Sequence, residues 1–335
     1  MHPRSIARVL CTVAAMLAAA ACGTRTPHPD GQPFAGDSRL PHIVAHRAGA
    51  GDFPENTLLA IEGALRNRAD MIWLTVQLSS DGVPVLYRPA DLAVNTQGAG
   101  PVAGKRFDEL QQLNAGWNFE RVDESGATRR PYRALPVPGA GLQPLAVPSL
   151  RQALEAIPAP LAVILDMKAL PAGPQAEAVA RVLGDMHAWN RVLIYSTDAS
   201  YQKAFARFPE ARLFESRDAT RTRLAAVALA GECVEPPAAS AWTAFELRRK
   251  MELTETFTLG EARSPVDARL WTVESVRCFR SRTHADILAI GVDTADDYRA
   301  AACLGIDAVL TDSPRKMRAV KAGIGAETPL RCAPR

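Results

Sequence analysis

The amino-acid sequence predicts an α/β protein built as a single (β/α)8 TIM barrel, with a long excursion after the second strand. The first observation is a set of eight short apolar segments that have the length of buried strands. The second is that helical segments separate most of them, which favours parallel strands joined by crossover helices. The third is size, because 335 residues, 47% of them apolar, suffice for one large domain. A doubly wound open sheet is the alternative, but no Gly-x-Gly-x-x-Gly motif follows the first strand.

The N-terminus has the features of an export signal. Residues 1–21 combine the basic residues Arg4 and Arg8 with an Ala-rich apolar run and small residues before Cys22. The segment LAAAAC resembles a bacterial lipoprotein signal, so we expect cleavage before Cys22 and a lipid on its sulfur. The protein is then a membrane-anchored lipoprotein that faces the periplasm or the cell exterior. An ordinary secretory peptide, which would release a soluble protein, is the alternative.

Three segments follow the leader. Residues 22–39 are rich in Pro, Gly and Asp and predict a tether, residues 40–320 predict the barrel, and residues 321–335 predict a C-terminal tail. The formal charge of +3 falls to +1 when the two leader arginines are subtracted, which gives no electrostatic reason to expect nucleic acid as a partner. After the leader, no apolar run is long enough for a membrane span.

The barrel is predicted to begin with a short apolar strand at residues 42–47, followed by a Gly-rich loop. An amphipathic helix is predicted over residues 55–68, with Asn56 or Thr57 near its N-cap.

The second strand is predicted at residues 70–78, and Asp81-Gly82 predicts a tight turn into another strand. Within the second strand, Trp73 and Thr75 lie two positions apart and therefore on one face.

The chain is irregular over about residues 98–148, apart from a short helix predicted at residues 106–113. An irregular segment this long inside a compact domain is usually a functional excursion. Beyond it, strand and helix alternate. The six further strands are predicted at residues 161–167, 191–195, 211–215, 231–235, 286–291 and 306–311. Helices are predicted at about residues 149–157, 174–188, 198–207, 219–229, 243–250 and 294–303, with an extra strand and helix within residues 268–282.

Four cysteines follow Cys22 in the chain: Cys233, Cys278, Cys303 and Cys332. None has the C-x-x-C or His-paired spacing of a metal site. An oxidising compartment would permit disulfides. In so large a domain we expect buried apolar cysteines or one incidental bridge, with no chemical role.

Several segments, taken in order, resemble the glycerophosphodiester phosphodiesterase family. They are AHRAGAGDFPENTLLAIEGAL, DGVPVLYRPADLAVNTQGAG, VPSLRQALEAIP, VILDMK and GVDTADDYRAAACLGIDAVLTDSP, spread over residues 42–315. The resemblance implies a (β/α)8 barrel that cleaves a phosphodiester between glycerol phosphate and an alcohol. It also implies a calcium or magnesium ion on carboxylates at the strand ends, and two histidines as general acid and base.

Three residues match the opening motif of that family. The resemblance makes His46 the catalytic histidine and Arg47 a phosphate-gripping residue, since a guanidinium offers a fork of donors to an anion. Glu55 matches the Glu of its Pro-Glu-Asn-Thr segment. A core histidine is the alternative for His46, and a first-turn acid that complements the helix dipole is the alternative for Glu55.

Other positions depart from the family pattern. Trp73 and Thr75 stand where the family has the two metal carboxylates of Glu-x-Asp, and an indole cannot bind a hard cation. Arg88 stands in place of the second histidine, and it cannot exchange a proton at neutral pH. Asp166 is the remaining family ligand, so we expect no resident metal cofactor. Lys168 matches a phosphate contact, with a lysine paired to Asp166 as the alternative.

The last matching segments are given no site role. The block GIDAVLTDSP is attributed to barrel closure. The family's Trp-Thr-Val-Asn motif corresponds to the segment from Ile290 to Asp293, and Trp271 in LWTVE lies too early in the chain to replace it.

These changes remove negative charge and leave His46, Arg47, Arg88 and Lys168 around one pocket. The sequence therefore predicts a non-hydrolysing family member that binds a phosphate or another small anion and takes part in lipid or glycerophosphodiester metabolism. One alternative is an active phosphoric diester hydrolase with a metal-independent mechanism. The other is an envelope scaffold lipoprotein.

Overall fold

The structure is a computed structural model that describes residues 40–123, 125–135, 144–237, 241–327, 330 and 332. The predicted leader and tether lie outside these residues. Within the described part of the chain, no helix is both long enough and apolar enough to cross a bilayer.

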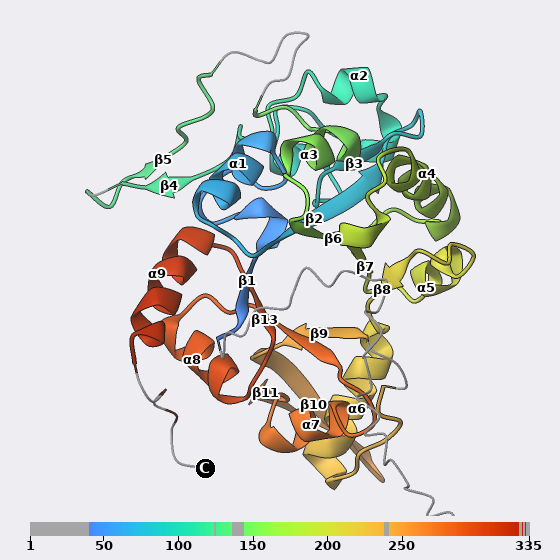
Figure 1. Cartoon of the computed structure of the whole chain (residues 1–335), viewed down its shortest axis with the longest axis vertical. Coiled ribbons are helices and arrows are strands. Elements are labelled where there is room, and N and C mark those ends of the chain that lie inside the picture. Colours follow the sequence, from blue (N-terminus) through green and yellow to red (C-terminus); the bar gives the residue numbers. More distant parts are fainter. Residues whose placement is uncertain are drawn as a thin grey trace, which may run out of the picture. The chain divides into compact units, whose positions relative to one another are not determined.

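Eight parallel strands form a nearly closed barrel, which confirms the predicted fold (Figure 1). They are β1 (His42–Ala45), β2 (Met71–Leu78), β6 (Ala162–Met167), β7 (Val192–Tyr195), β8 (Arg212–Leu213), β9 (Trp242–Glu246), β12 (Asp286–Ile290) and β13 (Ala308–Thr311). Hydrogen bonds join them in the order β8-β7-β6-β2-β1-β13-β12-β9. A parallel bridge between Phe214 and Trp242 joins the two ends of this row.

Helices connect the strands and cover them. They are α1 (Leu58–Arg66), α3 (Leu150–Ala156), α4 (Ala172–Asp185), α5 (Ser200–Phe205), α6 (Arg217–Ala230), α7 (Val273–Phe279), α8 (Ala295–Cys303) and α9 (Pro314–Gly325), with short 3-10 turns η1 (His46–Ala48) and η4 (Trp189–Arg191). Hydroxyl side chains cap several of them. Thr57, and not Asn56, accepts the N–H of Ala60 at the start of α1, and Ser149 forms a reciprocal capping box with Gln152 in α3.

Two apolar layers position the site. The barrel interior is filled by alternate strand residues, among them Val44, Met71, Trp73, Ile164, Leu193, Tyr195, Phe214, Trp242, Ala244, Leu288 and Leu310. The residues between them point outward and pack against the helices. Side chains alternate along a strand, so residues two positions beyond the last interior ones also point inward. These are His46, Thr75, Asp166, Glu246 and Asp312. These five therefore surround the carboxyl-end mouth of the barrel, where (β/α)8 proteins place their function.

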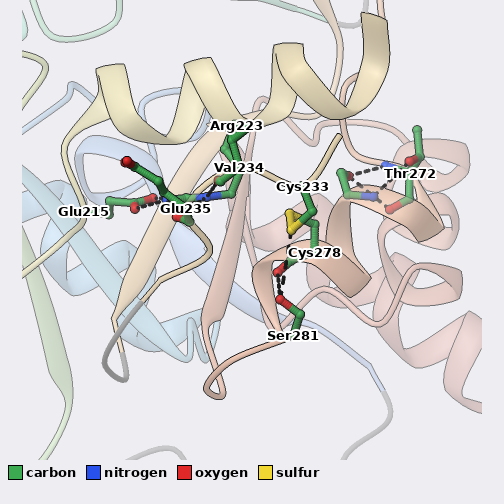
Figure 2. Close-up of a disulfide and its surroundings, with 9 residues drawn as sticks. Glu215, Arg223, Cys233, Val234, Glu235, Thr272, Cys278 and Ser281 are labelled. Atoms are coloured by element: carbon green, nitrogen blue, oxygen red, sulfur yellow. Dashed lines mark hydrogen bonds and ion pairs between the residues drawn. A yellow bond between two sulfur atoms is a disulfide. The ribbon is translucent and has the colours of Figure 1, made fainter. Parts of the chain in front are cut away.

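The predicted sixth strand, residues 231–235, is wrong, and so is the helix predicted at residues 243–250. The sixth strand is β9, eleven residues later. The earlier segment is a connection whose backbone carbonyls at Val234 and Glu235 both accept from the Arg223 guanidinium (Figure 2). Its Cys233 is bonded to Cys278 of α7. The short apolar pattern is typical of a strand, but the carbonyls of this segment accept from a side chain and its cysteine forms a disulfide.

An antiparallel ribbon follows β9, made of β10 (Arg249–Phe257) and β11 (Gly260–Ala268) (Figure 1). The sequence predicts one extra strand and helix within residues 268–282 and does not predict this ribbon. Its strands are exposed over most of their length, so they carry no continuous apolar run that would have indicated them.

The excursion after β2 begins as predicted. Gly82 has φ +78° in the turn, and β3 (Pro84–Leu86) pairs antiparallel with β2. It continues through η2 (Leu92–Val94), η3 (Val102–Gly104), α2 (Phe107–Leu110), β4 (Arg121–Val122) and β5 (Thr128–Arg129). The excursion packs around its own apolar cluster, which includes Tyr87, Leu92 and Leu110.

All four cysteines beyond Cys22 form disulfides, Cys233–Cys278 and Cys303–Cys332. The expectation of unpaired cysteines or one bridge is therefore wrong. The first bridge ties the connection before β9 to α7. The second ties the end of α8 to the C-terminal segment.

Candidate functional site at the carboxyl ends of the strands

His46 directly follows β1, and its ring is held on both sides. Its Nδ1 lies 2.6 Å from Oδ1 of Asp312, the residue after β13. A carboxylate only accepts, so in the neutral ring Nδ1 carries the proton and Nε2 accepts from Arg47 Nε–H at 3.3 Å. The bond to His46 holds the pKa of Asp312 below its usual value. His46 therefore has a defined orientation and tautomer.

Arg47 is fixed between a strained backbone and a carboxylate. Its φ of 50° lies in the left-handed region, a conformation that costs about 1–3 kcal/mol and is typical of functional sites. Its guanidinium pairs with Glu55, which also accepts from Asn95 Nδ2 at 3.2 Å. Glu55 precedes the first residue of α1, so it anchors Arg47 and is not a first-turn acid of that helix.

Trp73 and Thr75 both point into the barrel. The Trp73 side chain is 2% exposed, and its ring centroid lies 4.8 Å from Tyr195, 6.3 Å from Phe214 and 6.4 Å from His46. The backbone N–H of Thr75 donates to Asn56 Oδ1 at 2.9 Å. In the part of the chain that the structure describes, the buried Thr75 Oγ1 and Asn56 Nδ2 have no hydrogen-bond partner. An aromatic ring and two unpaired donors thus lie together at this side of the mouth.

Asp166 lies opposite Thr75 in the register of β2 and β6, and its carboxylate is 3.1 Å from Lys168 Nζ. Burial raises the pKa of Asp166, while Lys168 and then His46 lower it in part. The carboxylate therefore has a cationic partner within the chain, which is the paired alternative that the sequence left open for Lys168.

Arg88 lies beside this group but is exposed. Its neighbour Tyr87 donates its backbone N–H to the Thr75 carbonyl at 3.1 Å, which places Arg88 near the end of β2. Among the described residues, none forms a hydrogen bond or ion pair with Arg88. Its guanidinium is available to an anion at the rim.

A second group at the mouth was not predicted. Glu246, the last residue of β9, accepts from Arg217 at 2.6 Å and from Arg249 at 3.0 Å, and Arg217 also donates to the Tyr195 hydroxyl at 3.1 Å. Burial alone would raise the pKa of Glu246, but the bond and charge of Arg217 and the charge of Arg249 bring it below its usual value. This wall of the mouth carries two arginines on one carboxylate.

Comparison with known proteins identifies the family. The model of the glycerophosphoryl diester phosphodiesterase family matches residues 46–316, which is most of the chain. The chain belongs to this family. The match begins at His46 and ends just beyond Asp312, so it spans both partners of the histidine–carboxylate pair.

Relatives agree with this assignment. The Mycobacterium tuberculosis protein Rv2277c is 47% identical over 304 residues, which cover 90% of this chain and 96% of that protein. The crystal structure of its glycerophosphoryl diester phosphodiesterase domain is similar with a TM-score of 0.76 and 46% identity, covering 84% of this chain and 98% of that one. An Oleispira antarctica phosphodiesterase in complex with the product sn-glycerol-3-phosphate has a TM-score of 0.59 at 20% identity, covering 84% and 97%, and shares the fold.

Three carboxylates at this mouth each have a basic partner within the described chain. Asp166 is paired with Lys168, Asp312 with His46, and Glu55 with Arg47. Within the described ranges, the set of three residues whose acidic and imidazole atoms converge is His284, Asp286 and Asp307, at the opposite end of β12 and β13. Hard cations require several oxygen ligands, and the mouth supplies no such set from its described side chains.

Two residues at the mouth, Asp312 and Glu246, are not predicted as site residues, each for a different reason. Asp312 lay in a recognised segment but was attributed to barrel closure, although a carboxylate just after a barrel strand is itself a signal. Glu246 is missed because its strand is predicted eleven residues too early.

Proposed function

We propose that the mouth of the barrel binds a phosphate-type anion, such as a glycerophosphodiester or glycerol phosphate, without a resident metal ion and without hydrolysing it. The observation that carries this proposal is Trp73, buried among Tyr195 and Phe214 where the family pattern has a metal carboxylate. The role is in lipid or glycerophosphodiester metabolism, in keeping with the family.

Hydrogen-bond donors outnumber unpaired acceptors at the mouth, which supports an anionic ligand. Lys168 and Arg47 are cationic, although each has a carboxylate partner, and Arg88 has none among the described residues. Thr75 Oγ1 and Asn56 Nδ2 are buried without a partner in the described structure, and such donors cost about 1–3 kcal/mol each unless something accepts from them. A phosphate oxygen is an acceptor that would remove this cost.

The surroundings of His46 argue against ordinary acid–base catalysis in the state described. A general base needs a free lone pair, but Nε2 accepts from Arg47 and Nδ1 donates to Asp312. The family's second histidine is replaced by Arg88, so no described residue pair at the mouth supplies both an acid and a base.

A metal-independent phosphodiesterase is the second candidate, and the 2.6 Å contact between His46 and Asp312 favours it. A carboxylate that orients a histidine is the arrangement of known acid–base catalysts. If Arg47 turned toward a bound phosphate, Nε2 would become a free base, and Arg47 with Lys168 would offset the developing charge.

The experiment combines binding and turnover on protein treated with a chelator. Glycerophosphocholine is followed by calorimetry and by 31P NMR, with Lys168→Met as the test variant and Lys203→Met, an exposed lysine on α5, as the control. We expect binding that Lys168→Met abolishes and Lys203→Met preserves, with no product. Product formation that His46→Ala abolishes would establish the second candidate instead. No binding at all would favour the scaffold alternative.

The exported, lipid-anchored location remains a proposal, supported by the two disulfides, since such bonds persist in oxidising compartments. Expression in a bacterium with labelled palmitate tests it. The full chain should incorporate label and sediment with membranes, whereas Cys22→Ala should do neither. Release of an unlabelled soluble protein by both would indicate an ordinary secretory peptide.

A further inference from the structure

A second cavity lies away from the mouth, on the outer side of the barrel between β9 and α8. Its volume is about 490 Å³, within the range of small-ligand sites. It is lined by Leu247, Arg248, Arg269, Trp271, Val273, Asp296, Asp297, Arg299, Ala300, Cys303, Leu304 and Cys332. None of these residues belongs to the site described above.

One part of the cavity wall is apolar. Leu247 and Trp271 belong to the apolar layer between the barrel and its helices. The Trp271 indole N–H donates to the Phe245 carbonyl at 3.2 Å, so the ring offers the cavity only its apolar surface. Leu304 and the Cys303–Cys332 disulfide complete the wall.

Three arginines and three carboxylates lie in or beside the cavity. Arg248 pairs with Asp297, and Arg299 pairs with Glu327 at 2.6 and 2.7 Å. The hydrogen bond to Glu327 raises the pKa of Arg299, and the charge of the exposed Asp296 adds to this. Arg269 is exposed, and nothing in the described part of the chain forms a hydrogen bond or ion pair with it. Asp296 also has no such partner among the described residues, so the rim carries one unpaired guanidinium, which an anion can bind, and one unpaired carboxylate.

We propose that this cavity binds a single-chain amphiphile with an anionic head group. The chain packs against Trp271, Leu247 and Leu304, and the head pairs with Arg269. A fully polar ligand would lose hydrogen bonds to water against these walls, and a neutral apolar one would leave Arg269 unused.

The neighbouring ribbon supports an amphiphile as the ligand. Arg248 directly precedes β10 and Arg269 directly follows β11, so the residues at the open end of the ribbon line the cavity. The pairing register places Met251, Leu253, Phe257 and Val266 on one face, with Leu253, Phe257 and Val266 exposed by 45%, 58% and 40%, and Leu259 at the tip 99% exposed. This apolar face leads away from the cavity and offers an entering chain a surface that water does not favour.

Calorimetry with the full chain tests the proposal. Dodecyl phosphate and dodecanoate, each below its micelle concentration, represent the two head-group sources, while dodecyl maltoside supplies the same chain without charge and inorganic phosphate supplies the charge alone. We expect one equivalent of at least one anionic amphiphile to bind in preference to the maltoside, with no effect of inorganic phosphate.

Three variants locate the binding. Arg269→Ala should weaken it roughly two- to fivefold, as for an exposed ion pair, while Arg282→Ala, an exposed arginine outside the cavity, should not change it. Ala300→Trp, which fills the cavity from α8, should abolish it. Loss of binding in Lys168→Met would place the amphiphile at the mouth and overturn the proposal. Equal affinity for the maltoside, or equal losses with Arg269→Ala and Arg282→Ala, would overturn it as well.

Discussion

At the scale of single residues, two carboxylates at the mouth have opposite electrostatic situations. Asp166 is buried, and its pKa is raised although Lys168 lies 3.1 Å away. Asp312 accepts from His46, and its pKa is lowered. The surroundings therefore disfavour the ionised form of Asp166 and favour the ionised form of Asp312.

This contrast predicts opposite pH dependences of stability. Asp166 has a raised folded pKa, so its contribution is full below the unfolded value of about 3.9 and is lost as the pH rises through the folded value. Asp312 has a lowered folded pKa, so its contribution is present above about 3.9 and is lost as the pH falls.

Urea unfolding of wild type, Asp166→Asn and Asp312→Asn between pH 3 and pH 7 measures both effects. The free-energy advantage of wild type over Asp166→Asn should shrink as the pH rises, whereas its advantage over Asp312→Asn should grow. Parallel curves for the two variants would show that the two environments do not differ.

His46 provides a spectroscopic prediction. Its neutral ring should carry the proton on Nδ1, because that atom faces a carboxylate while Nε2 faces an arginine donor. Two-dimensional 15N–1H spectra of the imidazole resonances identify the tautomer. Asp312→Ala should shift the population toward the Nε2–H form. A wild-type ring already in that form would mean that the contact with Asp312 is not the one described.

The residues at the mouth show what could be inferred without the structure. His46, Arg47 and Lys168 follow strands that the apolar pattern located correctly, and Asp166 lies near the end of one, so their place at one end of the barrel was predictable. Their pairings were not, because an ion pair such as that between Arg47 and Glu55 depends on side-chain directions that residue spacing does not determine.

At the scale of elements, the second half of the barrel departs most from the prediction. Residues 231–235 have a strand-like composition, yet Arg223 binds their carbonyls and Cys233 forms a disulfide, while the true strand lies at Trp242–Glu246. Local pattern cannot distinguish these cases, because a carbonyl that accepts from a side chain looks the same in sequence as one in a ladder.

The β10–β11 ribbon leads to a prediction about stability. None of its described residues belongs to an apolar core cluster, so replacing residues 250–267 by a short Gly-Asn turn should change the free energy of unfolding by less than about 1 kcal/mol. By contrast, Trp271→Ala, just beyond the ribbon, should cost about 3–5 kcal/mol. Chemical denaturation of both variants tests this. A large loss on removing the ribbon would show that the barrel depends on it.

At the scale of the whole molecule, two disulfides stabilise the C-terminal half of the barrel. They close segments of 45 and 29 residues, and loop-closure entropy assigns about 4 and about 3.6 kcal/mol to them. We expect the double variants Cys233→Ala/Cys278→Ala and Cys303→Ala/Cys332→Ala each to lower the unfolding free energy by a few kcal/mol. An unchanged melting temperature after full reduction of wild type would contradict this.

Family membership and chemical activity are separate properties of this chain. The barrel, the His46–Asp312 pair and the Arg47–Glu55 pair are present, and the Trp73 indole is buried beside them. We propose that cationic side chains and buried donors bind a phosphate at this mouth without a metal ion.

The most direct test of this account is the metal dependence of ligand binding. sn-Glycerol-3-phosphate is titrated calorimetrically into protein freed of metal with EDTA and dialysed, and again with calcium or magnesium added. We predict the same affinity in all three conditions, and its loss in Lys168→Met. Binding that appears only when the divalent cation is present would contradict the central claim.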